Sequence, residues 1–284
     1  MKKNSSFFKV LIGLFLSVCL LGVSSLTFAG ELQRKLVQES AIEKIMRKGE
    51  MKIGIGIFVP WSFKDINGKL TGFEVDVAKK VAKDMGVKAK FVPTEWSGII
   101  PSLLTGKFDV IIGGMGITAE RALKVNFSNP YSYTGMDIVV SKKMLPGATS
   151  IADLNKSHII LAVRMGATPV SAAKKYLPKA KLHQFEDDAA VIQDVLNGNA
   201  HAALSSSPKP AFWAADYANA IYRPLDGKYL YDDPSSFAMR KGDADTMFFY
   251  NAWIADNQAF LEEKAAYWFG SKKWAHLVAD RKSV

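Results

Sequence analysis

Two successive runs of alternating strand and helix patterns constrain this chain more than any other feature of its sequence. The first run has strand patterns at residues 51–57, 91–92 and 110–112 and helical patterns at 75–85 and 97–104; the second has strands at 159–163, 182–185 and 200–204 and helices at 169–176 and 187–197. Strands that alternate with helices of this length pair in parallel. The pattern therefore predicts two α/β sets.

The segments around these two runs are also patterned. A helical pattern at residues 31–48 ends at Gly49, and residues 243–274 are mostly helical in pattern. The two runs join near residues 134–140. Gly49, Gly86, Gly106 and Gly198 lie at or near the ends of four helical patterns, and glycine is a usual stop signal because it adopts the left-handed conformation without strain.

The N-terminus has the pattern of a secretory signal peptide. Lysines at the start precede an apolar run at residues 10–21, and Thr27 and Ala29 are small residues of the kind that a signal peptidase reads. This pattern predicts a cleaved signal peptide at residues 1–29 and a periplasmic protein. Lipidation at Cys19 is disfavoured, because Val18 precedes it where such sites need a small residue.

Cysteine content and charge exclude several classes of function. Cys19 is the single cysteine, so we expect neither a disulfide nor a thiolate metal site in the mature chain. The formal net charge is +10, but lysines and arginines are scattered among acidic residues. Since only clustered charge indicates a polyanion partner, we expect no nucleic-acid binding.

Several motifs in the first half of the chain resemble one known family. They lie at residues 47–54, 68–76, 100–109, 113–121 and 127–131. Together they resemble the polar amino-acid-binding proteins of bacterial ABC importers, over essentially the whole mature chain.

The resemblance implies an α/β fold, a periplasmic-binding-protein-like clamp of two α/β lobes joined by a two-segment hinge. Lobe 1 would comprise residues 30–137 and 229–284, and lobe 2 residues 138–228. The hinge would bend near residues 134–140 and 226–235. A small amino-acid-like carboxylate would bind in the cleft, and the partner would be a membrane permease. We expect a monomer that holds no cofactor.

The motif at residues 113–121 carries the first predicted ligand contacts. In the family, the arginine that matches Arg121 binds the α-carboxylate of the ligand, and a guanidinium offers two parallel donors for this purpose. Gly114, Gly116 and Thr118 would bring backbone N–H groups to the same oxygens. The alternative for Arg121 is a surface ion pair with Glu120.

Aromatic residues are the second predicted group. Phe58, Trp61 and Trp96 lie where the family places rings against the side chain of the ligand. Aromatic walls exclude water and strengthen the polar contacts of a small ligand. Core packing is the alternative for each ring, and for Trp61 the two interpretations are balanced.

Lobe 2 supplies Thr168, Arg164 and Ser206. Thr168 matches a family threonine that gives the ligand carboxylate a donor at a helix N-terminus, although it could also be a simple N-cap. Ser206 matches an aspartate that pairs with the ligand α-ammonium in the family. Arg164 matches a position that faces the side-chain pocket, and an ion pair within lobe 2 is its alternative.

These two departures predict an unusually anionic ligand. Ser206 brings no charge, and Arg164 would add a second cation beside Arg121. A positive cleft favours an acidic amino acid or a carboxylate that lacks the amine. The competing account is that another acid, such as Glu95 or Asp137, has taken over the amine.

Other functions receive less support from the sequence. The Gly54 and Gly56 pair lacks the third glycine of a dinucleotide-binding loop. A dehydratase on this fold would need a cleft acid to protonate a leaving hydroxyl, and residues 205–209 contain none. The four histidines lack metal-ligand spacing, so we assign no catalytic or metal-binding residue. A ligand-sensing module is the remaining alternative.

Overall fold

The strand patterns of both runs become a single mixed sheet of ten strands, with a separate two-stranded hairpin. The computed structural model describes residues 39–278, and the residues from Ala41 onward form one unit. The strands are β1 (Glu50–Ile55), β2 (Phe63–Lys64), β3 (Leu70–Thr71), β4 (Lys88–Pro93), β5 (Val110–Gly116), β6 (Asn126–Phe127), β7 (Ser132–Ser141), β8 (Ile160–Arg164), β9 (Lys181–Phe185), β10 (Ala202–Ser206), β11 (Ile221–Tyr222) and β12 (Tyr231–Met239). The predicted signal peptide and the possible lipidation residue Cys19 lie outside the described residues.

Helices cover this sheet on both faces. They are α2 (Ala41–Lys48), α3 (Phe73–Asp84), α4 (Ile99–Leu104), α5 (Ala119–Ala122), α6 (Ile151–Leu154), α7 (Thr168–Tyr176), α8 (Asp188–Leu196), α9 (Lys209–Asp216), α10 (Ala244–Asp256) and α11 (Gln258–Phe269), with short 3-10 turns at Trp96–Gly98 and Ala275–Leu277. No helix among residues 39–278 is long and apolar enough to cross a membrane.

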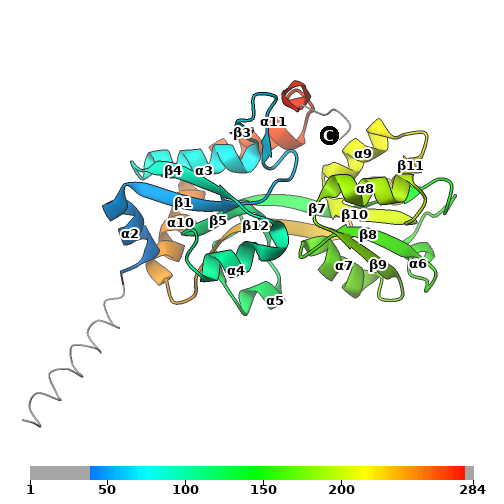
Figure 1. Ribbon diagram of the computed structural model, residues 1–284, viewed down its shortest axis with the longest axis horizontal. Coiled ribbons are helices and arrows are strands. Elements are labelled where there is room, and N and C mark those ends of the chain that lie inside the picture. The colour runs from blue at the N-terminus through cyan, green and yellow to red at the C-terminus, as the bar shows by residue number, and fades with distance from the viewer. Residues whose placement is uncertain (1–38, 279–284) are drawn as a thin grey trace, which may run out of the picture. The chain divides into compact units, whose positions relative to one another are not determined.

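The main path of the sheet runs in the order β4-β1-β5-β12-β7-β10-β8-β9 (Figure 1). We call β4, β1 and β5 the first parallel set, and β10, β8 and β9 the second parallel set, since neighbours within each set are parallel. Between the sets lie β12 and β7, which are antiparallel to each other and to their outer neighbours. The predicted parallel α/β layers are confirmed.

The first set is buried because helices pack on both of its faces. Met51 and Ile53 of β1 are fully buried and lie in one cluster with Val77 and Val81 of α3. On the opposite face, Leu103 of α4 belongs to a second cluster. Full burial of one aliphatic side chain contributes roughly 1.5–3 kcal/mol, so these two layers hold the set in place.

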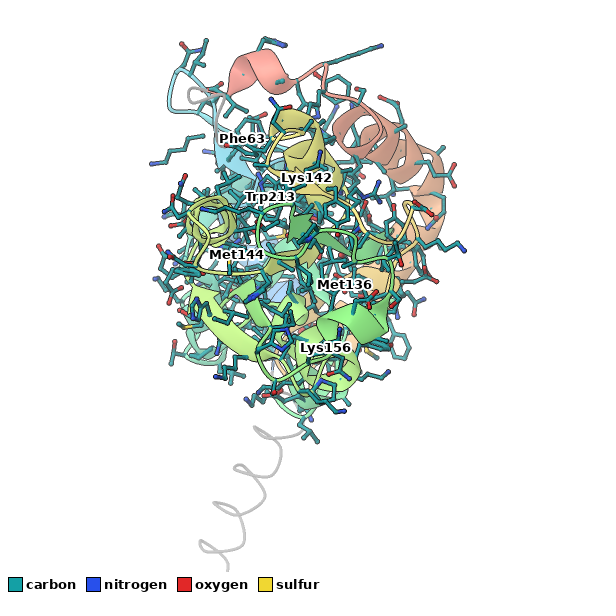
Figure 2. All side chains as sticks on the ribbon, turned by 90° about the vertical axis from the view of Figure 1, so that its right-hand side faces the viewer. Phe63, Met136, Lys142, Met144, Lys156 and Trp213 are labelled. Atoms are coloured by element: carbon teal, nitrogen blue, oxygen red, sulfur yellow. The ribbon has the colours of Figure 1, made fainter. Side chains whose placement is uncertain are left out.

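The second set is built in the same way. Leu161 and Val163 of β8 pack toward α7, whereas Ala162 between them belongs to the cluster that contains Trp213 of α9. Such alternation is what a strand buried on both faces requires. In Figure 2, which views the molecule from this side, Trp213 and Met136 are labelled at the two buried clusters.

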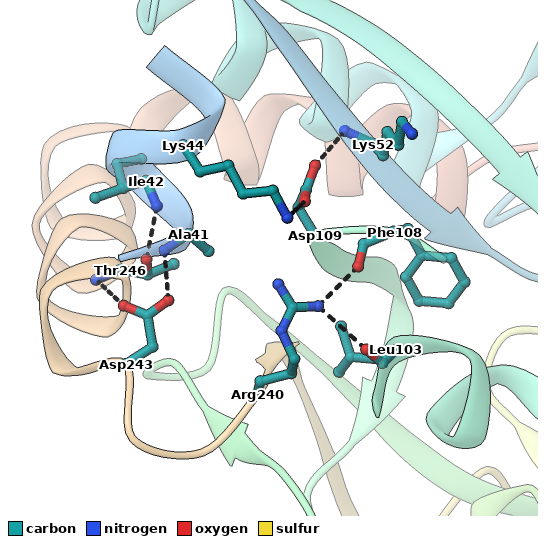
Figure 3. Close-up of polar contacts among 10 residues, drawn as sticks. All are labelled: Ala41, Ile42, Lys44, Lys52, Leu103, Phe108, Asp109, Arg240, Asp243 and Thr246. Carbon is teal, nitrogen blue, oxygen red and sulfur yellow. Dashed lines mark hydrogen bonds and ion pairs between the residues drawn. The ribbon is translucent and has the colours of Figure 1, made fainter. Parts of the chain in front are cut away.

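The C-terminal part of the chain returns to the first set. Asp243, at the N-terminus of α10, accepts hydrogen bonds from the backbone N–H groups of Ala41 at 2.8 Å and Thr246 at 3.0 Å (Figure 3). Arg240 donates to the carbonyl oxygens of Leu103 and Phe108. These bonds tie α2, α10 and the end of β12 to the first set.

Candidate functional site

The carboxyl ends of strands from both sets meet at one small cavity beside β7 and β12. β5 contributes Gly113 and Gly114, β8 ends at Arg164, and β10 ends at Ser206. In open α/β sheets, ligands bind at such carboxyl ends. The cavity is lined by Phe58, Trp96, Gly113, Gly114, Arg121, Arg164, Ala167, Thr168, Pro169, Asp188, Ser205 and Ser206.

Arg121 links the two sides of this cavity. It follows β5 in the short helix α5, whose N-cap is Thr118, and the Thr118 hydroxyl accepts from the Arg121 N–H at 3.2 Å. Its Nη1 donates to the carbonyl of Gly116 at 2.6 Å, and its Nη2 donates to the carbonyl of Gly166, before α7, at 2.9 Å. The side chain is 9% exposed, so burial lowers the pKa of Arg121. The alternative for Arg121, a surface ion pair with Glu120, is therefore wrong.

Two aromatic rings form the walls of the cavity. Trp96 lies about equally far from two guanidiniums, with its ring centre 6.0 Å from Cζ of Arg121 and 5.8 Å from Cζ of Arg164. The ring of Phe58 lies 5.7 Å from the same Arg164 atom. A cation over the face of an aromatic ring is attracted by the ring electrons. This attraction helps to hold the two guanidiniums and the two rings in place.

Trp61 lies behind the cavity and does not line it. Its ring stacks on Phe58 with centroids 4.2 Å apart, and it is 2% exposed within the core cluster of the first set. Gly114 has a φ of +68°, and a Cβ there would lie 2.7 Å from the Trp61 ring. Glycine at 114 is therefore required by both its backbone conformation and the position of Trp61.

The N–H of Gly114 is used inside the protein in this conformation. It donates to the Tyr131 hydroxyl at 3.2 Å, and that hydroxyl donates to Glu74 Oε2 at 2.6 Å. Burial raises the pKa of Glu74 to about 8, against the lowering effect of these hydrogen bonds. The predicted contact from Gly114 N–H to a ligand carboxylate would thus need Gly114 to leave Tyr131.

Arg164 both faces the cavity and is paired within the second set. Its Nε donates to the Glu186 carbonyl at 3.0 Å, and its Nη1 lies 3.6 Å from Asp188 Oδ2. Asp188 is also close to the buried Lys209, and burial lowers the pKa of Lys209 to about 8. The two predicted alternatives for Arg164 are therefore both present, and its charge has a counterion.

Thr168 and Ser206 meet an acid that the sequence argument missed. The Thr168 hydroxyl donates to Asp233 Oδ2 at 3.1 Å, and the Ser206 hydroxyl donates to the same oxygen at 2.7 Å. Asp233 lies on β12 and is 4% exposed. Burial raises its pKa, and the two hydroxyls and Arg121 oppose that shift. Thr168 is not the N-cap of α7, because Ala167 occupies that position.

Asp233 and Asp188 correct the charge argument for an anionic ligand. That argument assumed a cleft with two arginines and no carboxylate, and the structure places an acid beside each arginine. The proposed substitutes do not lie at the cavity: Glu95 is exposed, and Asp137 pairs with Arg223 at 2.8 Å. Asp233 carried only a weak sequence signal, namely its position before Pro234 in the predicted second hinge segment.

Two larger cavities flank the inner one. The inner cavity has a volume of about 30 Å³, close to the share of one water molecule in the liquid. A cavity of about 510 Å³, to which Thr118 contributes, shares Trp96, Arg121 and Ala167 with it. Another of about 540 Å³ shares Phe58 and Asp188. Ligand pockets usually measure about 300–1,000 Å³, so the inner cavity must expand to admit a ligand.

The predicted residues thus fall into three groups. Those that line the inner cavity are Phe58, Trp96, Gly114, Arg121, Arg164, Thr168 and Ser206. Thr118 lines the flanking cavity, and Gly116 packs against Asp233 and Thr168. Trp61 belongs to the core. Within residues 39–278, no group of three or more histidine, cysteine, aspartate or glutamate side chains is placed to hold a metal ion.

Comparisons with known proteins identify the family of this chain. Residues 40–271 match the family model described as bacterial extracellular solute-binding proteins, family 3. The L-cystine-binding protein of Escherichia coli (strain K12) is 31% identical over 258 residues, which cover 89% of this chain and 95% of that protein.

Two solved structures are similar over most of the chain. An ancestral amino acid-binding protein, a precursor of cyclohexadienyl dehydratase, is 41% identical with a TM-score of 0.72, and the match covers 81% of this chain and 100% of that one. A putative binding component of an ABC transporter from Wolinella succinogenes DSM 1740, complexed with lysine, is 38% identical with a TM-score of 0.73, over 80% of this chain and 98% of that one.

An enzyme also appears among the relatives. Cyclohexadienyl dehydratase of Pseudomonas aeruginosa is 25% identical over 171 residues, which cover 60% of this chain and 64% of the enzyme. Its similarity is lower than that of the binding proteins described above, and most of the named relatives bind amino acids.

Proposed function

We propose that this chain, which belongs to the bacterial extracellular solute-binding proteins of family 3, captures an L-α-amino acid between its two parallel sets and delivers it to the permease of an ABC importer. The observation that carries the proposal is the buried guanidinium of Arg121, which spans from Gly116 to Gly166 at the edge of an aromatic cavity. The names of the relatives support an amino acid as the ligand.

Arg121 would act by exchanging partners. In the present conformation it donates to two backbone carbonyls, one on each side of the cavity. A carboxylate is a stronger acceptor than a neutral carbonyl, and its two oxygens match the guanidinium fork. The ligand α-carboxylate would therefore replace one or both carbonyls, while Trp96 and Phe58 exclude water from the new ion pair.

Binding would require the two sets to separate and close again. The inner cavity of about 30 Å³ is too small for an amino acid. β7 and β12 run between the sets; β7 includes the proposed hinge segment near residues 134–140, and β12 overlaps the C-terminal half of the one near residues 226–235. Residues 30–137 with 229–284 and residues 138–228 stay our proposed lobes. A ligand favours closure only through contacts it makes to both.

We favour binding over catalysis, although the argument from sequence must change. Residues 205–209 contain no acid, but Asp233 reaches the Ser206 hydroxyl from another strand. A dehydratase would need a protonated acid there. Burial raises the pKa of Asp233, but its carboxylate accepts two hydroxyl protons and faces Arg121, and these contacts oppose the protonated form that a proton donor would need. Incubation with a cyclohexadienyl substrate should give no aromatic product.

The remaining parts of the proposal concern location and assembly. The extracellular family supports export to the periplasm. We propose that the protein is a monomer. We also propose that it does not bind nucleic acid, because its charged residues are scattered and not clustered. Size-exclusion chromatography with light scattering tests the first point, and a filter-binding assay with duplex DNA tests the second.

A calorimetric panel tests the function. Wild-type protein is titrated with L-lysine, L-arginine, L-glutamine, L-glutamate and L-cystine, and at least one should bind. Arg121→Ala should then weaken that binding by about 2–5 kcal/mol, because the carboxylate is left without its charged partner.

Arg240→Ala is the matched control for this test. Arg240 also donates to two backbone carbonyls, those of Leu103 and Phe108, but it does not line the cavity. Its loss should lower stability and leave affinity unchanged. Equal affinity in Arg121→Ala and wild type would remove the basis of the proposal.

A further inference from the structure

Asp233 occupies an unusual position in this fold. It lies on the crossing strand β12, where it pairs with Thr134 of β7, and the neighbouring Ser235 pairs with Gly116 of β5. Its side chain reaches away from its own strand to the hydroxyls of Thr168 and Ser206, which both line the inner cavity. A buried acid therefore lies directly behind two cavity-lining hydroxyls.

The direction of these hydrogen bonds determines what the hydroxyls can recognise. Each hydroxyl has one proton, and Asp233 takes it in both cases. The Ser206 oxygen is left with lone pairs toward the cavity, so it can only accept. Thr168 is similar, but it also hydrogen-bonds the phenol of Tyr231. Hydroxyl oxygens that accept hydrogen bonds, with a carboxylate behind them, suit a positively charged group that has several N–H donors.

Glycine at position 116 leaves space for the Asp233 side chain beside the Thr168 hydroxyl. A Cβ at Gly116 would lie 2.6 Å from Asp233 Oδ1 and 2.6 Å from Thr168 Cγ2. Any larger residue at 116 would push the acid away from the hydroxyls. The glycine thus sets the approach of β5 to Asp233, in addition to presenting a carbonyl to Arg121 at 2.6 Å.

Other acids near the cavity already have partners. Asp188 lies 3.6 Å from Arg164, and Asp137 lies 2.8 Å from Arg223. Glu74 accepts from Tyr131 on the far side of Gly114 and does not line the cavity. Asp188 also lines the cavity, where it accepts from the Ser205 hydroxyl at 3.4 Å and has Arg164 as its ion-pair partner. Asp233 differs in that it accepts from two cavity-lining hydroxyls, those of Thr168 and Ser206.

We infer that Asp233, acting with the Ser206 hydroxyl, binds the α-ammonium group of the ligand, so that the anionic partner of the amine comes from β12 and not from the end of β10. This inference rests on the proposed function. With the carboxylate at Arg121 and the ammonium at Asp233, the protein recognises the zwitterionic part of an amino acid with two opposite charges. A carboxylate without the amine would leave Asp233 without its partner.

The test compares amino acids with analogues that lack only the α-amine. For the amino acid that wild-type protein binds most tightly in the panel, calorimetry is repeated with its deaminated counterpart, for example glutarate for L-glutamate or ε-aminocaproate for L-lysine. Wild type should prefer the amino acid. Asp233→Asn should weaken amino-acid binding by more than about thirtyfold, because the buried ammonium loses its counterion, and should not weaken binding of the analogue.

Two further variants sharpen the result. Asp232→Asn removes an exposed acid next to Asp233 on the same strand and should leave both affinities unchanged. The double variant Asp233→Asn with Ser206→Asp returns an acid to the end of β10, within hydrogen-bond reach of position 233. It should recover part of the amino-acid binding. Thermal melts of each variant confirm that it is folded before titration.

The outcomes separate this inference from the proposed function. If wild type binds no member of the panel, the proposed function fails and the inference with it. If wild type binds and Asp233→Asn binds equally well, only the inference fails. Equal weakening of the amino acid and its analogue by Asp233→Asn would also overturn it, because Asp233 would then only hold the hydroxyls in place.

Discussion

Glu74 is a buried carboxylic acid in α3, the helix that packs on the first parallel set, and it lies on the far side of Gly114 from the cavity. It is 0% exposed, and the nearest donor to it is the Tyr131 hydroxyl at 2.6 Å. Burial raises its pKa from 4.5 to about 8. The folded protein therefore holds the proton over a pH range in which the unfolded chain has released it.

This shift predicts a pH-dependent stability. Between about pH 4.5 and about pH 8 folding takes up one proton at Glu74, so the free energy of unfolding should fall as pH rises, by up to about 1.4 kcal/mol per unit. The loss should stop above about pH 8. Glu74→Gln should remove this component, as measured by urea unfolding across the range, with the exposed-site variant Glu262→Gln as the control. Identical slopes in Glu74→Gln and wild type would mean that the folded protein holds Glu74 ionised.

Single residues of the site were predictable where a motif fixed them. Arg121, Trp96 and Thr168, which the motifs singled out, line the inner cavity, and their contacts with a ligand stay predictions. Asp233 was not predictable, because its hydroxyl partners lie 27 and 65 residues away and belong to other strands and helices. A sequence pattern records spacing along the chain, whereas this contact depends on how β12 crosses between the sets.

Among the elements, α10 depends on a cap that also holds α2. Asp243 accepts from Thr246 N–H within α10 and from Ala41 N–H at the start of α2. One carboxylate thus satisfies donors at two helix N-termini that would otherwise have no intrahelical partner.

Asp243→Ala should lower the free energy of unfolding by about 1–3 kcal/mol, the sum of a lost cap and a lost interhelical bond. Asp245→Ala, in the same first turn but exposed, should change it by less than about 1 kcal/mol. Chemical unfolding of the three proteins gives both numbers. A loss in Asp243→Ala no larger than that in Asp245→Ala would show that the shared cap is unimportant.

Most helices and strands were predictable from the spacing of hydrophobic residues and from glycines at helix ends. Helix α9 and the long strands β7 and β12 were not. α9 begins at Lys209 after Pro208 and contains Pro210, and it is not among the helices that the sequence pattern predicted. Proline fits the first turn of a helix, since those N–H groups have no intrahelical partner. The long strands β7 and β12 were predicted only as crossings, because their pairing joins residues almost a hundred positions apart.

At the scale of the whole molecule, the inner cavity determines what must move. Its walls come from both parallel sets, and Arg121 bonds across it to Gly166. An empty protein in solution can lose this bond and open, whereas a ligand that touches both sides holds them together.

Small-angle X-ray scattering should therefore give a smaller radius of gyration with a binding amino acid than without one. The same measurement on Arg121→Ala should show no change on adding that amino acid. If the wild-type radius is identical in both states, the two sets do not move as a clamp, although binding itself would stand.

The position of Trp96 gives the protein a built-in optical signal. Of the six tryptophans, Trp96 lines the cavity near two guanidiniums, while the other five, including Trp61 behind Phe58, pack in hydrophobic clusters and do not line it. Indole emission responds to charges near the ring, and a ligand that exchanges the partners of Arg121 alters those charges. The fluorescence of the native protein, without any attached dye, should therefore report occupancy of the cavity in real time.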